Sequence, residues 1–208
     1  MKVKYRTLLE CALSGFTHVA DHKSQQWFNA HFPAAVISGV SILTEFKSLA
    51  DDCISGIEQS IHKVITDHQE FFAYSLFSDD HRDTIAPDVA CARIEWALRD
   101  NARFLTSSGH GIIFGVLAIK SILALGEPIP SSIIDALETI IDWTEEDNPN
   151  RYYGVTDYQS RTVELGDVAS IDSVESAIDF IMANQHCVYP DQSIEGGHYF
   201  FTGDKLHE

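Results

Sequence analysis

Apolar residues recur every three or four positions along most of the first 145 residues, and this spacing places them on one face of an α-helix. The stripe is clearest after Asp51, where Ile54, Ile57, Ile61 and Ile65 fall on one side and charged residues on the other. The pattern predicts four helices in the first half of the chain, over residues 4–20, 31–47, from about 51, and 87–105.

A very apolar helix is predicted next, because Ser and Gly precede it and Gly126 with two prolines follows it. These are the residues that usually start and stop a helix. Its central part, residues 112–125, carries a single charge at Lys120. We therefore expect this segment to be a buried helix.

The last third of the chain is less regular. A further helix begins near Ser131, and residues 145–170 then lose helical spacing, which predicts a long irregular loop or a short hairpin. A last helix is expected through about residue 184, with Asp172 or Ser173 as its N-cap.

Two apolar segments resemble each other and indicate a weak internal repeat. AHFPAAVISGVSIL and GHGIIFGVLAIKSIL both place a histidine before a helix rich in small residues, and these histidines, His31 and His110, lie 79 residues apart. GGHYFFTG, with His198, is a candidate third copy. We predict an all-α fold of about seven helices in antiparallel hairpins, forming a single domain over residues 1–208.

The chain is strongly acidic, with 31 acidic and 14 basic residues and a formal net charge of -17. Such a charge repels nucleic acid and anionic membrane surfaces, so neither is an expected partner. Apolar runs stay below the roughly 20 residues that cross a bilayer. The four cysteines lie far apart and form no CxxC pair, as in proteins with reduced thiols. We expect a soluble, cytoplasmic protein.

His110 is the first candidate catalytic residue. Gly109 and Gly111 flank it, so a ligand can approach the backbone closely, and it lies at the positive N-terminal end of an apolar helix. A neutral imidazole there can polarise a carbonyl or accept a proton. The alternative interpretation is structural, with His110 capping its helix or satisfying a buried carbonyl.

Four other residues are candidates at the same site. His31 is the repeat equivalent of His110 and a second candidate catalytic residue, and His198 is a candidate ligand-binding residue by the same argument. Asn29 accompanies His31, although Asn at a helix entrance is also a common cap. Tyr153 in the long loop can line a ligand entrance or fix the loop to the helices.

Other chemistries lack their sequence signatures. His18 and His22 stand four residues apart, which would place both imidazoles on one helical face, but no third or fourth metal ligand can be named. The chain has no GxSxG, no GxxxxGK[ST] and no GxGxxG motif. We therefore expect no metal and no cofactor.

FNAHFPAAVISGVSIL and FLTSSGHGIIFGVLAIKSI resemble helices of the questin-oxidase-like family, in which a histidine opens an apolar helix with a glycine nearby. That family is α-helical, and its characterised members are linked to cofactor-independent oxidation of aromatic polyketides. The resemblance implies roles for His31 and His110. GHGIIFG is also similar to the HG-containing helices of lanthionine-cyclase-like α/α toroids, but their zinc-binding Cys pattern is absent, so no cyclase activity is expected.

Two functions follow as hypotheses. The first is a helical protein that binds a small organic molecule near His110 and transfers protons, or oxidises the molecule without a cofactor. The second is a non-catalytic acidic protein, of the immunity or inhibitor type, that masks a basic protein partner. The same acidity also has an explanation without any partner, since surface carboxylates keep proteins in solution.

Overall fold

The computed structural model describes most of the first 146 residues and a few later positions. The described residues are 2–22, 26–73, 76–78, 83–104, 106–146, 173, 175–176, 179, 182–183, 193–194 and 198–199. The chain divides into two compact units, residues 1–146 and 147–208, each considered by itself. Most of the second unit lies outside the described residues, so a single domain over the whole chain stays a prediction.

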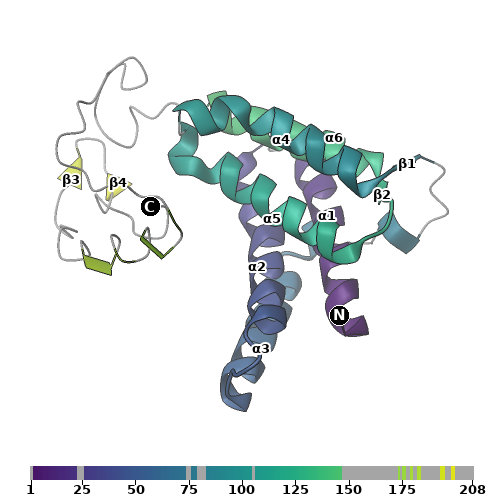
Figure 1. Ribbon diagram of the computed structural model, residues 1–208, viewed down its shortest axis with the longest axis vertical. Helices are drawn as coiled ribbons and strands as arrows, with labels where there is room; N and C mark the ends of the chain where they lie inside the picture. Colours follow the sequence, from purple (N-terminus) through teal and green to yellow (C-terminus); the bar gives the residue numbers. More distant parts are fainter. Residues whose placement is uncertain are drawn as a thin grey trace. The chain divides into compact units, whose positions relative to one another are not determined.

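The first unit is built almost entirely of helices, which confirms the all-α prediction (Figure 1). The described α-helices are α1 (Val3–Asp21), α2 (His31–Glu45), α3 (Asp51–Asp67), α4 (Pro87–Phe104), α5 (His110–Leu125) and α6 (Ser131–Glu146). Six are described, against about seven predicted. Short 3₁₀ turns connect them: η1 (Trp27–Ala30), η2 (Gln69–Phe71), η3 (Leu76–Ser78) and η4 (Thr106–Gly109).

The helix boundaries follow the local signals in the sequence. Pro87 is the first residue of α4, where its missing N–H costs nothing. Gly126 ends α5 with φ of 68°, a left-handed conformation that glycine adopts without strain. Two very short strands, β1 (Thr84–Ile85) and β2 (Ile129–Pro130), pair antiparallel with Ile85 opposite Ile129 and so join the starts of α4 and α6.

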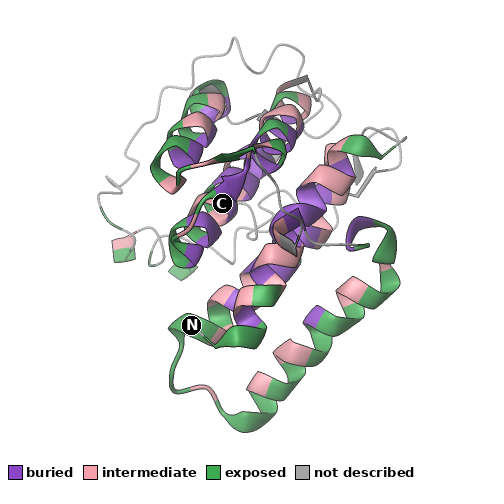
Figure 2. Ribbon diagram, turned by 90° about the vertical axis from the view of Figure 1, so that its right-hand side faces the viewer, coloured by how far each residue is buried: buried purple, intermediate pink, exposed green. Residues whose placement is uncertain are grey.

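Consecutive helices pack against each other, as expected for helical hairpins. α1 packs on α2, α2 on α3, α4 on α5, and α5 on α6. Longer-range contacts of α1 with α6, of α4 with α6 and of α2 with α5 close these pairs into one core. Figure 2 shows the buried residues along the sides of the helices that face one another. No helix among the described residues has both the length and the apolarity to cross a bilayer.

The core of the first unit is made of aliphatic stripes around a few aromatic rings. Phe16 of α1 and Phe114 of α5 are buried and their ring centroids lie 6.5 Å apart. The inward face of α6 is fully buried and consists of Ile133, Ile134, Leu137, Ile140 and Ile141. These residues recur every three or four positions, so the apolar spacing in the sequence and the packing agree.

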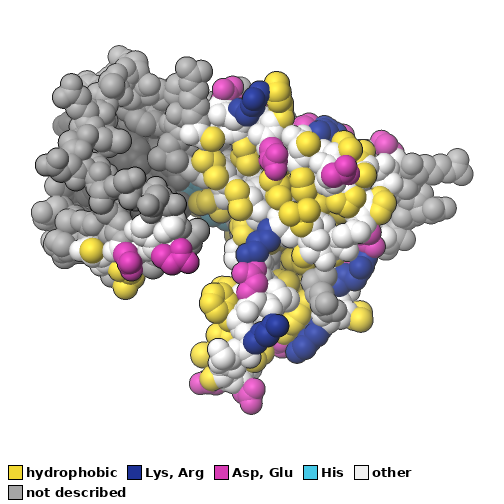
Figure 3. All heavy atoms as spheres, in the orientation of Figure 1, with side chains coloured by type: hydrophobic (Ala, Val, Ile, Leu, Met, Phe, Trp, Pro, Cys, Tyr) yellow, Lys and Arg dark blue, Asp and Glu magenta, His cyan; other side chains and the backbone are white. Residues whose placement is uncertain are grey.

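α5 is only partly buried, although its sequence predicts a buried helix. Phe114, Ala118 and Ile122 are buried, but Val116 is 51% exposed and Leu123 is 63% exposed. Hydrophobic side chains gather over α5 and the neighbouring part of α4 on the face shown in Figure 3. The helix therefore lies at the edge of the core and carries an apolar outer face.

α3 is the most exposed helix of the first unit and packs mainly on α2. Among its residues only Ile61 is buried, and its side chain lies against Gly39 of α2 so closely that a Cβ there would come within 2.8 Å. An apolar groove of about 490 Å³ runs beside this contact, lined by residues of both helices and by Leu49 of the connection between them. α3 is thus attached by one narrow apolar contact with α2 and by hydrogen bonds from Lys4 and Tyr5 of α1 to Glu58.

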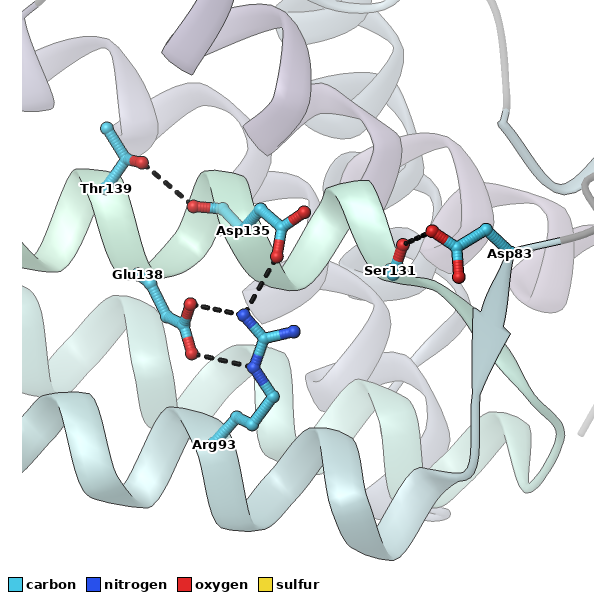
Figure 4. A network of polar contacts seen from close by, with 6 residues as sticks. All are labelled: Asp83, Arg93, Ser131, Asp135, Glu138 and Thr139. Carbon is cyan, nitrogen blue, oxygen red and sulfur yellow. Dashed lines mark hydrogen bonds and ion pairs between the residues drawn. The ribbon is translucent and has the colours of Figure 1, made fainter.

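α4 and α6 are joined by an ion-pair network that centres on Arg93 (Figure 4). Its guanidinium donates to both carboxylate oxygens of Glu138 and lies 2.8 Å from Asp135 Oδ1. These hydrogen bonds, first those to Glu138 and then that to Asp135, raise the pKa of Arg93 above its ordinary value. At the start of α6, Ser131 donates its hydroxyl to Asp83 at 2.7 Å, in the segment that leads into β1.

The second unit is described at few positions. Ser173 and Ser176 exchange hydrogen bonds between side-chain oxygens and backbone N–H groups at 3.0 Å, an arrangement that caps a helix N-terminus. The rest of the predicted last helix lies mostly outside the described residues. β3 (Ser193–Ile194) pairs antiparallel with β4 (His198–Tyr199). His198 is therefore in a strand, and its proposed place at the start of a third helical repeat is wrong.

We expect Arg93→Ala to lower the free energy of unfolding by about 1 kcal/mol, the upper end for a partly exposed pair, because the guanidinium holds two helices through a fork of hydrogen bonds. The loss should shrink in high salt. The control is Lys63→Ala, which removes an exposed ion pair with Asp67 inside α3 and should cost less than about 0.5 kcal/mol. Urea unfolding of both variants measures this, and equal losses would contradict it.

Candidate functional site

The structure brings His31 and His110 together. Each is the first residue of its helix, α2 or α5, and each follows a 3₁₀ turn. Their ring centroids lie 4.7 Å apart, with the ring planes at 68°. The N-termini of two helices therefore converge, and the partial positive charges of both ends act on the same small region.

Both histidines use the same backbone hydrogen bond. His31 Nδ1 lies 2.7 Å from the carbonyl oxygen of Phe28, and His110 Nδ1 bonds the carbonyl oxygen of Ser107, in each case three residues earlier in the chain. A carbonyl oxygen can only accept, so Nδ1 carries the proton and donates. In the neutral ring the lone pair is then on Nε2, which is the nitrogen able to take up a proton.

Three aromatic residues surround the two imidazoles, and we name the five residues together the histidine cluster. Trp27 lies 4.7 Å from the His110 ring, Phe28 lies 4.6 Å from the His31 ring, and Phe114 contacts both histidines at 5.4 and 5.9 Å. His110 is 8% exposed, whereas Phe28 is 60% exposed. The cluster therefore extends from the core to the surface.

The turn before α5 is built from unusual backbone conformations. Gly109 has φ of 80°, and Ser107 has φ of 47°, the one positive φ of a residue other than glycine in the described part of the chain. Ser107 is buried, and its hydroxyl donates to the backbone oxygen of Thr144 in α6 at 2.5 Å. This bond holds the turn in place next to His110.

Polar side chains of α4 and α6 lie behind the first turn of α5. Asn101, Thr144 and Glu145, together with Ser107, are named the polar network. Thr144 Oγ1 lies 3.0 Å from Asn101 Oδ1 and 2.6 Å from the carbonyl of Ile141, and Asn101 and Thr144 are both fully buried. Asn101 Nδ2 donates to Glu145 at 3.0 Å. All members have hydrogen bonds, as burial of polar groups requires.

Glu145 completes the polar network and has an altered acidity. Its partial burial raises the pKa of the carboxyl, and the nearby charges of Asp100 and Asp142 raise it further, while the hydrogen bond from Asn101 opposes them. A raised pKa means that the folded protein holds this proton more tightly than the unfolded chain does.

The glycines of the predicted site have structural roles. A Cβ on Gly111 would lie 2.3 Å from Asn101 Oδ1 and 2.5 Å from Thr144 Oγ1, so α5 can approach α4 and α6 only without a side chain there. Gly109 supplies the left-handed N-cap of α5. A ligand contact at either glycine stays a prediction.

The remaining predicted residues divide between described and undescribed positions. Asn29 lies in η1, one residue before Ala30, which is the N-cap of α2, so Asn29 is not the cap. Tyr153 lies outside the described residues. His198 is described only in its backbone, within β4 of the second unit.

His18 and His22 would share a helical face only if both lay on one helix, and the structure does not place them so. α1 ends at Asp21, and His22 has extended backbone angles, φ of -69° and ψ of 138°, so the two imidazoles do not share a helical face. The His22 ring packs on Phe71 at 5.3 Å. Within the described ranges no group of three or more His, Cys, Asp or Glu side chains could hold a metal ion.

Comparison of the chain with protein-family models, with curated proteins and with solved structures found no match. The resemblances to questin-oxidase-like and lanthionine-cyclase-like helices therefore stay predictions.

Sequence reasoning identified both histidines but missed their neighbours. For Asn101 and Thr144 a signal exists, since each is a polar residue on the apolar stripe of its helix, three positions after Leu98 and Ile141 respectively. Buried polar residues of this kind usually have a specific partner. Trp27 carries no comparable signal, because it lies in a short polar stretch without helical spacing.

We expect Gly111→Ala to destabilise the protein by about 1–3 kcal/mol, because the new methyl group would overlap Asn101 and Thr144. Gly56→Ala is the matched control, since Gly56 lies in α3 with no atom within 4 Å of the added Cβ. That variant should gain about 0.5–1 kcal/mol from its better helix propensity. Chemical unfolding compares the two, and a Gly111→Ala variant as stable as the parent would refute the contact.

Glu145→Gln should change how stability depends on pH. Because the pKa of Glu145 is raised in the folded state, the parent protein loses stability as the pH rises from the ordinary value of 4.5 through the raised value. Gln keeps an oxygen for Asn101 but does not titrate, so the variant should lack this loss and be more stable at neutral pH.

The control for this experiment is Glu58→Gln. Hydrogen bonds from Lys4 and Tyr5 lower the pKa of Glu58, so its charged form stabilises the folded state and Gln should reduce stability at neutral pH. Thermal unfolding over a pH series that starts near 4.5 measures both variants. The same direction of change in both variants at neutral pH would contradict the assignment.

Proposed function

We propose that the protein binds a small organic molecule at the histidine cluster and that His31 and His110 transfer protons to and from it. The observation that carries this proposal is the contact between the two imidazoles, each with its Nδ1 bonded to a backbone carbonyl. Two rings from distant parts of the chain thus hold the proton on the same nitrogen, Nδ1, and imidazole is the side chain that most often transfers protons near neutral pH.

The surroundings of the imidazoles favour a planar molecule with a hydroxyl or carbonyl group. Trp27 and Phe28 offer aromatic faces on the exposed side of the cluster, and rings stack on such faces with a gain of about 0.5–1.5 kcal/mol. The converging N-termini of α2 and α5 favour a carbonyl oxygen or an anion. When Nε2 accepts the proton of a hydroxyl, the O–H bond breaks, the imidazole becomes cationic, and the oxyanion formed meets this positive potential.

The alternative function, an acidic protein that masks a basic partner, has less support. It is favoured by Trp96 of α4, which is 70% exposed and lines a groove of about 400 Å³ together with Asp88 and Glu138. However, Glu138 is already paired with Arg93. On the face shown in Figure 3, acidic side chains are scattered among basic and hydrophobic ones and do not form one acidic surface.

The proposal is tested by titrating the protein with 1,8-dihydroxyanthraquinone, a planar probe that carries both hydroxyl and carbonyl groups. We expect binding to quench tryptophan fluorescence, because Trp27 lies within the cluster. His110→Ala and His31→Ala should each weaken binding about tenfold or more, the effect of losing a hydrogen bond in a desolvated site. Isothermal titration calorimetry gives the affinities.

His62→Ala is the control, since His62 is an exposed histidine of α3 outside the cluster. It should bind the probe as the parent does. Circular dichroism and thermal unfolding verify that all variants are folded. Equal affinity in the parent and in both cluster variants would refute the proposal.

A further inference from the structure

His110 and His31 reach the same hydrogen bond by different routes. The turn that leads into His31 has no positive φ, and the bond to Phe28 forms in an ordinary 3₁₀ turn. The turn that leads into His110 contains Ser107 with φ of 47° and Gly109 with φ of 80°. A left-handed residue other than glycine costs of order 1–3 kcal/mol and persists only where its surroundings hold it.

The hydroxyl of Ser107 is the group that holds this turn. It donates to the backbone oxygen of Thr144 at 2.5 Å, in a position that is 1% exposed. The carbonyl oxygen of the same serine accepts the bond from His110 Nδ1. Ser107 therefore connects α6 to the imidazole: its side chain bonds the backbone of α6, and its carbonyl bonds the His110 ring.

The polar network gives this connection a rigid support. Asn101 and Thr144 are fully buried and hydrogen-bonded to each other, and the missing side chain of Gly111 lets the first turn of α5 lie directly against both. Because close-packed interiors transmit strain, a change in this packing would act on the turn that carries the Ser107 carbonyl.

We propose that Ser107 is a positioning residue, held by the polar network, that keeps the proton of His110 on Nδ1 and so keeps the lone pair on Nε2. The inference rests on the proposed function, because it concerns the nitrogen that would exchange protons with the bound molecule. Ser107 acts only through the ring that it orients.

The experiment observes the histidine tautomers directly, by long-range ¹H–¹⁵N correlation spectra of the full chain labelled with ¹⁵N-histidine. Ser107→Ala removes the hydroxyl but keeps a side chain at positive φ. Ser107→Gly also removes the hydroxyl, and glycine adopts a positive φ without strain. This variant is therefore the one to measure if the alanine variant does not fold. Ser121→Ala is the control, because it deletes the hydroxyl of a different buried serine, which lies in α5 and donates to the carbonyl of Leu117 in the same helix.

In Ser107→Gly we expect the ratio of the Nδ1–H to the Nε2–H tautomer of His110 to fall about tenfold, as for the loss of one hydrogen bond. The ratio for His31, which has its own bond to Phe28, should not change and serves as the reference inside the molecule. Ser121→Ala should leave both ratios unchanged. An unchanged ratio for His110 in the glycine variant would overturn the proposal.

Affinity for 1,8-dihydroxyanthraquinone separates this inference from the proposed function. A shifted tautomer with weakened binding supports both. A shifted tautomer with unchanged binding upholds the positioning role of Ser107 and rejects the use of His110 in binding. Weakened binding with an unshifted tautomer rejects the positioning role alone.

Discussion

The first unit depends on how the N-terminus of α5 is accommodated inside the protein. α5 is the most apolar of the described helices, and its first residue, His110, is buried although the rest of the helix lies at the edge of the core, so the turn that leads into it must be held by other parts of the protein. The turn before this start contains two left-handed residues and is held by two hydrogen bonds: the hydroxyl of Ser107 donates to the backbone oxygen of Thr144 in α6, and the imidazole of His110 donates to the carbonyl of Ser107. The place of His110 beside His31 follows from this arrangement.

The helices were predictable because each carries its own signals within a few residues. Gly126 ends α5 where a left-handed residue is needed, and Pro87 begins α4 where no N–H is needed. The isoleucine stripe of α6 predicts both the helix and the side that is buried. The degree of burial of α5 was not predictable in this way, since an apolar sequence does not indicate how many neighbours surround it.

The candidate site was predictable only in part. His31 and His110 have a similar local context, and that similarity was enough to name both residues. The weak repeat was a reason to place both at one site, but it does not indicate that the start of α2 and the start of α5 lie close enough for the two rings to be in contact. The same holds for Ser107 and Thr144, which are 37 residues apart and whose bond depends on the packing of α5 against α6. The four-residue spacing of His18 and His22 would matter only on a helix that reaches His22, and α1 ends at Asp21.

The narrow attachment of α3 has a consequence for the motions of the protein. Because α3 packs mainly on α2 and fully buries one side chain, its release exposes little apolar surface and breaks the hydrogen bonds of Lys4 and Tyr5 to Glu58. We therefore expect opening of α3 alone to cost less free energy than unfolding of the whole core. Its amide protons would then exchange with solvent well before those of α5 and α6, and the free energy of this local opening would lie below that of global unfolding.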